Sequence, residues 1–389
     1  MDITYFVREF DLVTGGGHSY SLDTIATNMA KRGHNINIVT SSYNIDNDME
    51  YDIYDSIGKT SNIVKEAKSV YSELSKWSES SDIIHIFSPN YIAIAGVYKY
   101  RNPNTKIVGR LNSYSFCSNY SMMDGSCHKN CGIQSKFNHS PHDSYENLTR
   151  LPLYTIQTYI EPHLMSNLDH LIAISPSVKK IYSEYGVNKE KITIINMPFE
   201  GKWNSKNIAR DIENNTMFSI LYVGRLGKKK GVDILINAIA EISDIHLDVV
   251  GDGSEREYLE KLVSDLNVKE KVTFHGYINH DDIPKFYKNS DLFVHPSLWP
   301  EPMGRTIFES LQYNLPVITP DVGGSEWVAG SAGKSFKRGD PNDLRKTICR
   351  IRSNPELYND LSNKTQQELE RFEIKSSIDS IKDVYDKQL

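Results

Sequence analysis

Short apolar segments alternate with amphipathic segments along this sequence, and the pattern appears twice. In the first half, strands are predicted at Ile3–Val7, Ile36–Thr40, Ile83–Phe87, Lys106–Leu111, Leu171–Ser175 and Ile192–Asn196. Helical patterns such as Ser21–Lys31 and Ile63–Trp77 lie between them. Strands that alternate with helices form a parallel sheet covered on both faces. The first half is therefore predicted to be a doubly wound α/β domain.

The polar segment 201–216 has no hydrophobic periodicity and is predicted to link this domain to a second one. Beyond it the alternation resumes, for example with a strand at Phe218–Val223. A chain of 389 residues is long enough for two domains with their own cores. We expect domains at 1–200 and 217–370, with a cysteine-bearing insertion at about 112–150. A C-terminal helix at 371–389 is expected to pack back on the first domain.

The composition limits the class of protein. Hydrophobic residues make up 39% and charged residues 24%, as in soluble globular proteins. A net charge of −6 argues against general affinity for nucleic acid. No segment approaches the roughly 20 apolar residues of a membrane helix, and the N-terminus enters a strand without a signal-peptide pattern. We therefore expect a cytoplasmic protein.

Two acidic residues, Glu301 and Glu309, frame the most informative motif. An apolar strand runs into Glu301, and Gly304 then opens a helix that carries Glu309. Backbone N–H groups at a helix start donate hydrogen bonds to phosphate, here near Met303, Gly304 and Arg305. The two carboxylates would accept hydrogen bonds from hydroxyls on either side of the phosphate. A ligand in which a diphosphate joins two groups with several hydroxyls each is a nucleotide sugar.

Two glycine-containing turns also follow strands. Arg225 and Lys230 are five residues apart in the turn after the first strand of the second domain, so both can reach one cleft, and both side chains suit phosphate oxygens. The neighbouring Lys228 and Lys229 fit a solvated basic turn. The turn Gly15–Gly17 allows close approach to an anion or a sugar, although a plain turn is the alternative. It is not a G-x-G-x-x-G motif, which disfavours a nicotinamide enzyme.

Together these motifs resemble family 4 retaining glycosyltransferases of the GT-B fold, and the resemblance covers nearly the whole chain. The matching segments are Gly15–Gly17, Lys31–Ile36, Gly224–Gly231, Gly251–Gly253, Phe274–Tyr277 and Glu301-x7-Glu309. The resemblance implies two doubly wound Rossmann-like domains that face each other across a cleft. It also implies that domain 1–200 binds the acceptor and domain 217–370 binds the nucleotide sugar.

The resemblance also implies roles for individual residues. Arg225 and Lys230 would bind the donor diphosphate and stabilise the leaving charge. Glu309 would bind the ribose, and Glu301 would bind the transferred sugar, so that Glu301, Arg225 and Lys230 are the catalytic candidates. The remaining donor-side positions are Gly16, Gly17, Tyr277, Met303, Gly304 and Arg305.

The resemblance also implies that no metal is needed. Consistent with this, no obvious carboxylate pair that could bind magnesium lies beside these motifs. Cations and helix N-termini would replace it. The implied donor is a UDP-, GDP- or ADP-sugar, and the acceptor is a glycan, a lipid-linked molecule or a small molecule. A lipid-linked acceptor would bring the protein to the inner membrane surface. The sequence leaves the base, the sugar and the acceptor open.

One region departs from the family. Many relatives carry a His after the fourth or fifth strand of the first domain, and this chain has none there. Arg110 or Asn112 is expected to make that contact. His85 matches a recurrent family position, although a His inside a strand is more often structural.

The insertion carries Cys117, Cys127 and Cys131, with histidines nearby. Such a cluster could hold a structural zinc ion. Buried free thiols are the alternative, and a disulfide is disfavoured in a reducing cytosol. A fourth cysteine, Cys349, lies in a helical pattern and is expected in the core.

Two other functions remain open. A nucleotide-sugar 2-epimerase has a comparable two-domain cleft, but it needs acids and a His positioned for proton removal, which the Glu301-x7-Glu309 spacing does not suggest. A non-catalytic protein that kept the fold would be favoured by loss of Arg225, Lys230 or either acid, and all four are present.

Overall fold

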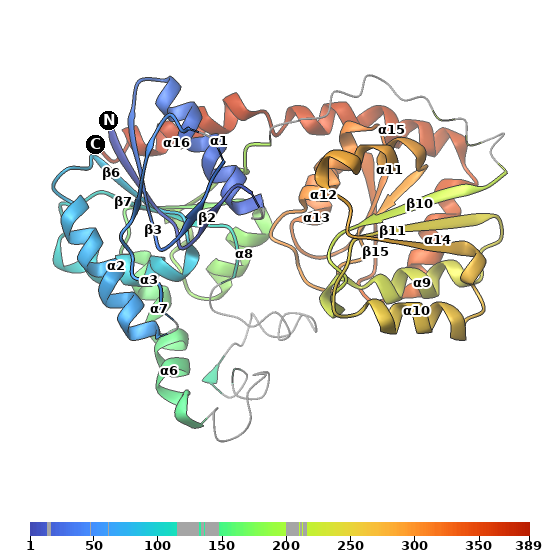
Figure 1. Ribbon diagram of the computed structural model, residues 1–389, viewed down its shortest axis with the longest axis horizontal. Helices are drawn as coiled ribbons and strands as arrows, with labels where there is room; N and C mark the ends of the chain where they lie inside the picture. Colours follow the sequence, from blue (N-terminus) through green and yellow to red (C-terminus); the bar gives the residue numbers. More distant parts are fainter. Residues whose placement is uncertain are drawn as a thin grey trace. The chain divides into compact units, whose positions relative to one another are not determined.

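The computed structural model describes residues 1–13, 17–46, 48–60, 62–114, 132–133, 136, 148–199, 210, 212 and 216–389. The chain divides into two compact units. Unit 1 comprises Met1–Glu200 and Phe372–Leu389, and unit 2 comprises Gly201–Arg371. Each unit is built on one parallel sheet with helices on both faces (Figure 1). The predicted pair of doubly wound sheets is therefore confirmed. The predicted linker lies almost entirely outside the described residues.

The sheet of unit 1 has seven parallel strands in the order β5-β3-β1-β6-β7-β8-β9. The strands are β1 (Asp2–Phe6), β3 (Asn35–Thr40), β5 (Asp52–Asp55), β6 (Ile83–Ile86), β7 (Ile107–Leu111), β8 (His170–Ala173) and β9 (Ile192–Ile194). A short parallel pair, β2 (Phe10–Asp11) and β4 (Tyr43–Asn44), follows β1 and β3. The central strands are mostly apolar and almost wholly buried because both of their faces are covered.

Seven α-helices lie in the described part of unit 1. They are α1 (Gly17–Lys31), α2 (Ile63–Trp77), α3 (Pro89–Arg101), α6 (Leu151–Tyr159), α7 (Glu161–Ser166), α8 (Pro176–Glu184) and α16 (Ile374–Asp386). Helices α1 and α16 cover one face, where Ile25 and Ile381 share a core with Ile38 and Val108 (Figure 1). The C-terminal helix α16 thus belongs to unit 1.

Helices α3 and α7 lie together on the opposite face. They approach so closely that a Cβ at Gly96 would come within 2.0 Å of the Leu164 carbonyl oxygen. Only glycine permits that separation, because any larger residue would push the two helices apart. Gly109 in β7 similarly leaves room for Leu168 and Leu171.

The sheet of unit 2 has six parallel strands in the order β12-β11-β10-β13-β14-β15. The strands are β10 (Phe218–Val223), β11 (Ile245–Val250), β12 (Val272–Gly276), β13 (Leu292–Val294), β14 (Val317–Pro320) and β15 (Gly333–Phe336). The order reverses between β10 and β13. Ligands of doubly wound sheets bind beyond the carboxyl ends of the strands at such a reversal.

The helices of unit 2 are α9 (Val232–Ala240), α10 (Arg256–Asp265), α11 (Pro284–Asn289), α12 (Arg305–Gln312), α13 (Ser325–Ala329), α14 (Pro341–Arg352) and α15 (Pro355–Glu370). Alternate residues of β13 face opposite sides. Leu292 and Val294 pack in the core under α9, α10 and α14, whereas Phe293 contacts Tyr287 of α11. The predicted core position of Cys349 is wrong. Cys349 is exposed on α14, because Ile348 and Ile351 form the buried face of that helix.

No helix among the described residues is long and apolar enough to cross a membrane.

Candidate functional site

The strand reversal of unit 2 brings a lysine and an acid into direct contact. Lys230 lies in the turn after β10, and Glu301 lies in the loop after β13. The Lys230 ammonium donates a hydrogen bond to Oε1 of Glu301 and forms an ion pair with it. The two side chains are 22% and 12% exposed, respectively. The structure thus joins two of the predicted site residues that are far apart in the sequence.

Backbone contacts between the two loops fix this pair. The carbonyl oxygen of Lys229 accepts hydrogen bonds from Trp299 N at 3.2 Å and from Ser297 Oγ at 3.2 Å. The Lys229 ammonium lies over the Trp299 ring, 4.5 Å from its centroid. Gly231 has φ +66°, and a Cβ there would lie 2.2 Å from the Pro296 carbonyl oxygen. Glycine at 231 therefore permits both the left-handed turn and the close approach of the loops.

The charge state of Glu301 follows from this environment. Burial by itself raises the pKa of its carboxyl, but the Lys230 ammonium, together with smaller contributions from His295 and Lys229, outweighs burial, so the pKa of Glu301 lies below its usual value. His295 lies at the end of β13 and is 5% exposed. Burial lowers the pKa of His295 to about 4, while Glu301 and Lys230 act on it in opposite directions. Neither ring nitrogen of His295 has a hydrogen-bond partner in the described part of the chain. Glu301 is therefore ionised at neutral pH beside a neutral imidazole.

The second acid, Glu309, is 3% exposed on α12 and is surrounded by donors. Tyr287 Oη donates to its Oε2 at 2.9 Å, His280 Nε2 lies 3.3 Å from its Oε1, and Arg305 Nε lies 3.5 Å from the same oxygen. Burial, followed by the Glu309 charge, raises the pKa of Tyr287 well above its usual value, so the phenol stays protonated and donates. The second predicted acid is thus held in place by partners that lie before it in the sequence.

Helix α12 begins beside both acids. Gly304 is its N-cap, and Ile307 N donates to the Gly304 carbonyl oxygen at 3.0 Å. The first N–H groups of a helix lack partners within the helix and attract anions. Met303 is 8% exposed, and Arg305 is half-buried at the first helical position. The predicted phosphate-binding turn therefore stands at the start of a helix, close in sequence to Glu301.

The other predicted donor-side residues are less enclosed. Arg225 is exposed in the turn that also carries Lys230. Tyr277 is 76% exposed directly after Gly276, whose φ is +69°. Gly17 is the first residue of α1, in unit 1, and Gly16 lies outside the described residues.

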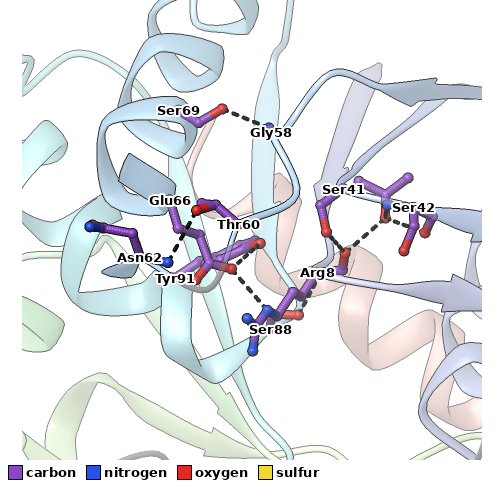
Figure 2. A network of polar contacts seen from close by, with 11 residues as sticks. Arg8, Ser41, Ser42, Gly58, Thr60, Asn62, Glu66, Ser69, Ser88 and Tyr91 are labelled. Atoms are coloured by element: carbon purple, nitrogen blue, oxygen red, sulfur yellow. Dashed lines mark hydrogen bonds and ion pairs between the residues drawn. The ribbon is translucent and has the colours of Figure 1, made fainter. Parts of the chain in front are cut away.

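In unit 1 the strand order reverses between β1 and β6, and polar groups gather at their carboxyl ends (Figure 2). Arg8 follows β1, and its Nε lies 2.9 Å from Oε1 of Glu66 on α2. Tyr91 Oη donates to the same oxygen at 3.2 Å. Arg8 N donates to Ser88 Oγ at 2.8 Å, and Ser41 Oγ donates to the Arg8 carbonyl oxygen. Three strand ends and two helices are therefore tied together at this edge.

Two of the predicted acceptor-side residues lie inside unit 1. His85 and Arg110 are both 0% exposed. His85 Nδ1 lies 2.5 Å from the hydroxyl of Tyr385 on α16, and Arg110 Nη2 donates to the Asn196 carbonyl oxygen at 3.3 Å. Burial lowers the pKa of Arg110 to about 10. Both side chains are enclosed in this structure, where a ligand on the surface would not reach them.

The third acceptor-side residue, Asn112, is half-buried directly after β7. Its Nδ2 lies 3.0 Å from the Phe87 carbonyl oxygen and 2.9 Å from Nδ1 of His18. His18 is half-buried in the first turn of α1.

The predicted zinc ligands Cys117, Cys127 and Cys131 lie outside the described residues. Among the residues that are described, no group of three or more His, Cys, Asp or Glu side chains is arranged to hold a metal ion.

Sequence reasoning missed several residues of these sites. His280, Tyr287 and His295 lack a recognisable local motif, because their roles depend on contacts across the fold. His18 did have a signal, since it directly follows the glycine turn.

Two family models match consecutive parts of the chain. The model described as Glycosyltransferase Family 4 matches residues 15–199, and the model described as Glycosyl transferases group 1 matches residues 205–368. The second match contains both acids, and it also contains the basic turn after β10.

Individual relatives match shorter parts. An uncharacterized glycosyltransferase of Methanocaldococcus jannaschii is 38% identical over 150 residues, which are 38% of this chain and 37% of the relative. The lipopolysaccharide core biosynthesis glycosyltransferase LpsE of Rhizobium meliloti is 29% identical over 205 residues, which are 52% of this chain and 59% of LpsE. Each match spans less than two thirds of the relative.

Solved structures match over the full length. HepE of Anabaena, solved in complex with UDP, has a TM-score of 0.72 at 19% identity, and the match covers 100% of both chains. The lipopolysaccharide outer core galactosyltransferase WaaB, in its apo form, has a TM-score of 0.73 at 15% identity, again over 100% of both chains. At these identities the likeness shows a common fold.

Proposed function

Because the chain belongs to the family 4-like glycosyltransferases of the GT-B fold, we propose that it moves a sugar from a nucleotide-sugar donor to an acceptor hydroxyl. The observation that carries the proposal is the contact between Lys230 and Glu301 at the strand reversal of unit 2. A cation and an acid at this position, beside the start of α12, match a ligand that has both phosphates and hydroxyls.

In the proposed donor complex, Lys230 and Arg225 bind the diphosphate, with the backbone N–H groups of Met303–Arg305. Glu309 accepts hydrogen bonds from the ribose hydroxyls, and Glu301 accepts them from the transferred sugar. Negative charge grows on the diphosphate as the glycosidic bond breaks. Cations and amides that are already in place stabilise this charge without having to reorganise.

The ion pair also implies a step that precedes catalysis. While Lys230 is bound to Glu301, each neutralises the other. A diphosphate carries more negative charge than one carboxylate and competes for the Lys230 ammonium. Once Lys230 turns to the phosphates, the Glu301 oxygens can accept hydrogen bonds from sugar hydroxyls. Donor binding is thus an exchange of partners within the site.

We further propose that the transferred sugar keeps its anomeric configuration and that no metal is required. In this mechanism the acceptor hydroxyl attacks from the face that the diphosphate leaves, and the departing phosphate takes its proton. The similarity to LpsE, named for lipopolysaccharide core biosynthesis, favours a glycan or lipid-linked acceptor. A lipid-linked acceptor would bring the enzyme to a membrane surface.

A thermal-shift panel of UDP, GDP and ADP, each with and without a sugar, tests the proposal. UDP and UDP-glucose come first, because HepE was solved with both. A ligand present at about 100 times its Kd stabilises the native state by about 2.7 kcal/mol. We expect one base to stabilise the protein and Lys230→Ala to abolish the effect, while Lys228→Ala, in the same turn, retains it. Indifference to every nucleotide would refute the proposed function.

Product analysis tests the finer statements. With a stabilising donor, the anomeric signal of the product should show the donor's configuration, and turnover should persist in excess EDTA. Inverted product or loss of turnover in EDTA would refute the retaining and metal-independent mechanism, respectively.

A further inference from the structure

An imidazole and an amide meet at the carboxyl edge of the unit 1 sheet. Asn112 follows β7, and His18 lies in the first turn of α1. The Asn112 side-chain nitrogen lies 3.0 Å from the Phe87 carbonyl oxygen and 2.9 Å from Nδ1 of His18. The His18 ring packs against the Phe87 ring, with 4.9 Å between the centroids. Three separate elements thus hold His18 in one orientation.

This arrangement fixes the tautomer of His18. The Phe87 carbonyl oxygen only accepts hydrogen bonds, so the Asn112 atom that faces it must be the amide nitrogen. That nitrogen carries two hydrogens and donates the second one to His18. Nδ1 of His18 must therefore be the unprotonated acceptor, and the ring proton is on Nε2.

The imidazole is also neutral. Burial lowers the pKa of His18 to about 4, and the positive charge of Arg110 acts in the same direction. Arg110 lies under the same aromatic ring, with its guanidinium carbon 5.5 Å from the Phe87 centroid. A neutral imidazole whose Nδ1 is already engaged cannot take a proton from a substrate there. It can only donate a hydrogen bond from Nε2.

We propose that His18 donates a hydrogen bond from Nε2 to a hydroxyl oxygen of the acceptor sugar, and that Asn112 is the positioning residue that sets its tautomer. The inference rests on the proposed function, since a glycosyltransferase must orient an acceptor hydroxyl. His18 also places an imidazole near the end of β7, although no His directly follows that strand in the chain. His18 binds the acceptor in this role and is not its general base.

The tautomer can be measured on the full-length protein, independently of any ligand. In 15N-histidine NMR spectra, the His18 signal can be assigned because it disappears in His18→Phe. This signal should show an unprotonated Nδ1 and a protonated Nε2 between about pH 6 and 8, which is the range in which an unperturbed histidine would titrate. Asn112→Asp should reverse this, because a carboxylate can only accept a hydrogen bond and therefore favours the tautomer that donates from Nδ1–H. An Nδ1–H tautomer or a doubly protonated ring in the wild-type protein would overturn the inference.

The ligand contact is tested with methyl α-glycosides of glucose, galactose and mannose as acceptor probes. We expect at least one to shift the His18 Nε2–H signal. His18→Phe keeps the ring but loses the donor, so the Kd of that glycoside should rise about 2- to 12-fold, the range for one neutral hydrogen bond. His18→Gln, whose amide can donate from a similar position, should recover most of the affinity. His163→Phe, an exposed site on α7, should change nothing.

Equal glycoside affinity in His18→Phe and the wild-type protein, or no glycoside-induced shift, would overturn the contact. A shift caused by UDP-glucose but by none of the glycosides would also overturn it. These outcomes leave the proposed function intact if a nucleotide still stabilises the protein, because the diphosphate contacts of Lys230 lie in unit 2. If no nucleotide stabilises the protein, the proposed function fails whatever the tautomer of His18.

Discussion

Removing the Lys230 side chain should destabilise the protein and change how its stability responds to pH. In Lys230→Ala, Glu301 keeps its charge in a mostly buried position but loses its cation. Breaking a buried ion pair from one side costs roughly 3–5 kcal/mol. Water reaches this pair, since the side chains are 22% and 12% exposed. We therefore expect a loss of about 2–3 kcal/mol at pH 7.

The pH dependence separates this explanation from a simple loss of packing. In the wild-type protein, the lowered pKa of Glu301 contributes stability above the unfolded-state pKa of about 4.3, and this is lost as the pH falls through the folded-state pKa. Without Lys230, burial raises the pKa of Glu301, so lowering the pH relieves the penalty. The Lys230 charge lowers the pKa of the neighbouring His295, so its removal makes protonation of His295 easier. This also reduces the stability difference from the wild-type protein at low pH.

Urea denaturation at pH 7 and at about pH 4.5, followed by tryptophan fluorescence, measures both effects. The difference between the wild-type protein and Lys230→Ala should shrink on acidification. Lys228→Ala removes an exposed lysine of the same turn and should stay within about 0.5 kcal/mol of wild type at both pH values. Glu301→Gln should cost only about 1 kcal/mol, because Lys230 is exposed enough to be hydrated. An equal loss at both pH values would refute the electrostatic reasoning.

Two further substitutions test the packing of unit 2. Tyr287→Phe removes the hydroxyl that donates to Glu309 and should cost about 1–3 kcal/mol of unfolding free energy, whereas Tyr258→Phe, at a 53% exposed side chain, should cost almost nothing. Similar urea midpoints for the two variants would contradict the assigned contact. Gly323→Ala and Gly33→Ala both place alanine at a φ near +80°, but only the added Cβ at 323 lies 2.7 Å from neighbouring backbone. Thermal unfolding should therefore show that Gly323→Ala is more destabilised than Gly33→Ala by at least about 1 kcal/mol. Equal melting temperatures of the two variants would contradict this, because they would show that the loop at 323 moves to accept the added Cβ.

The fold could be predicted because the strands that form its centre are apolar and separated by helices of ordinary length. The strands that were not predicted lie where that pattern is weak. Strand β5 is at the sheet edge and reads Asp-Ile-Tyr-Asp, with mostly exposed side chains, and β15 reads Gly-Lys-Ser-Phe. Such segments become strands because they pair with a neighbouring strand, and their own residues carry little signal. Helix α3 carries little amphipathic signal, because its apolar residues do not fall on one face.

The sequence determined that this chain forms two parallel α/β sheets and that acids, cations and glycines follow particular strands. Those features are local, since they depend on hydrophobic periodicity and on residue order within a loop. Only the tertiary structure decided which side chains meet. The strand reversal between β10 and β13 brings Lys230 to Glu301, and the β6–β7 edge of unit 1 brings Asn112 to His18. These pairings depend on strand order and loop packing, so the charge of Glu301 and the tautomer of His18 follow from the folded chain.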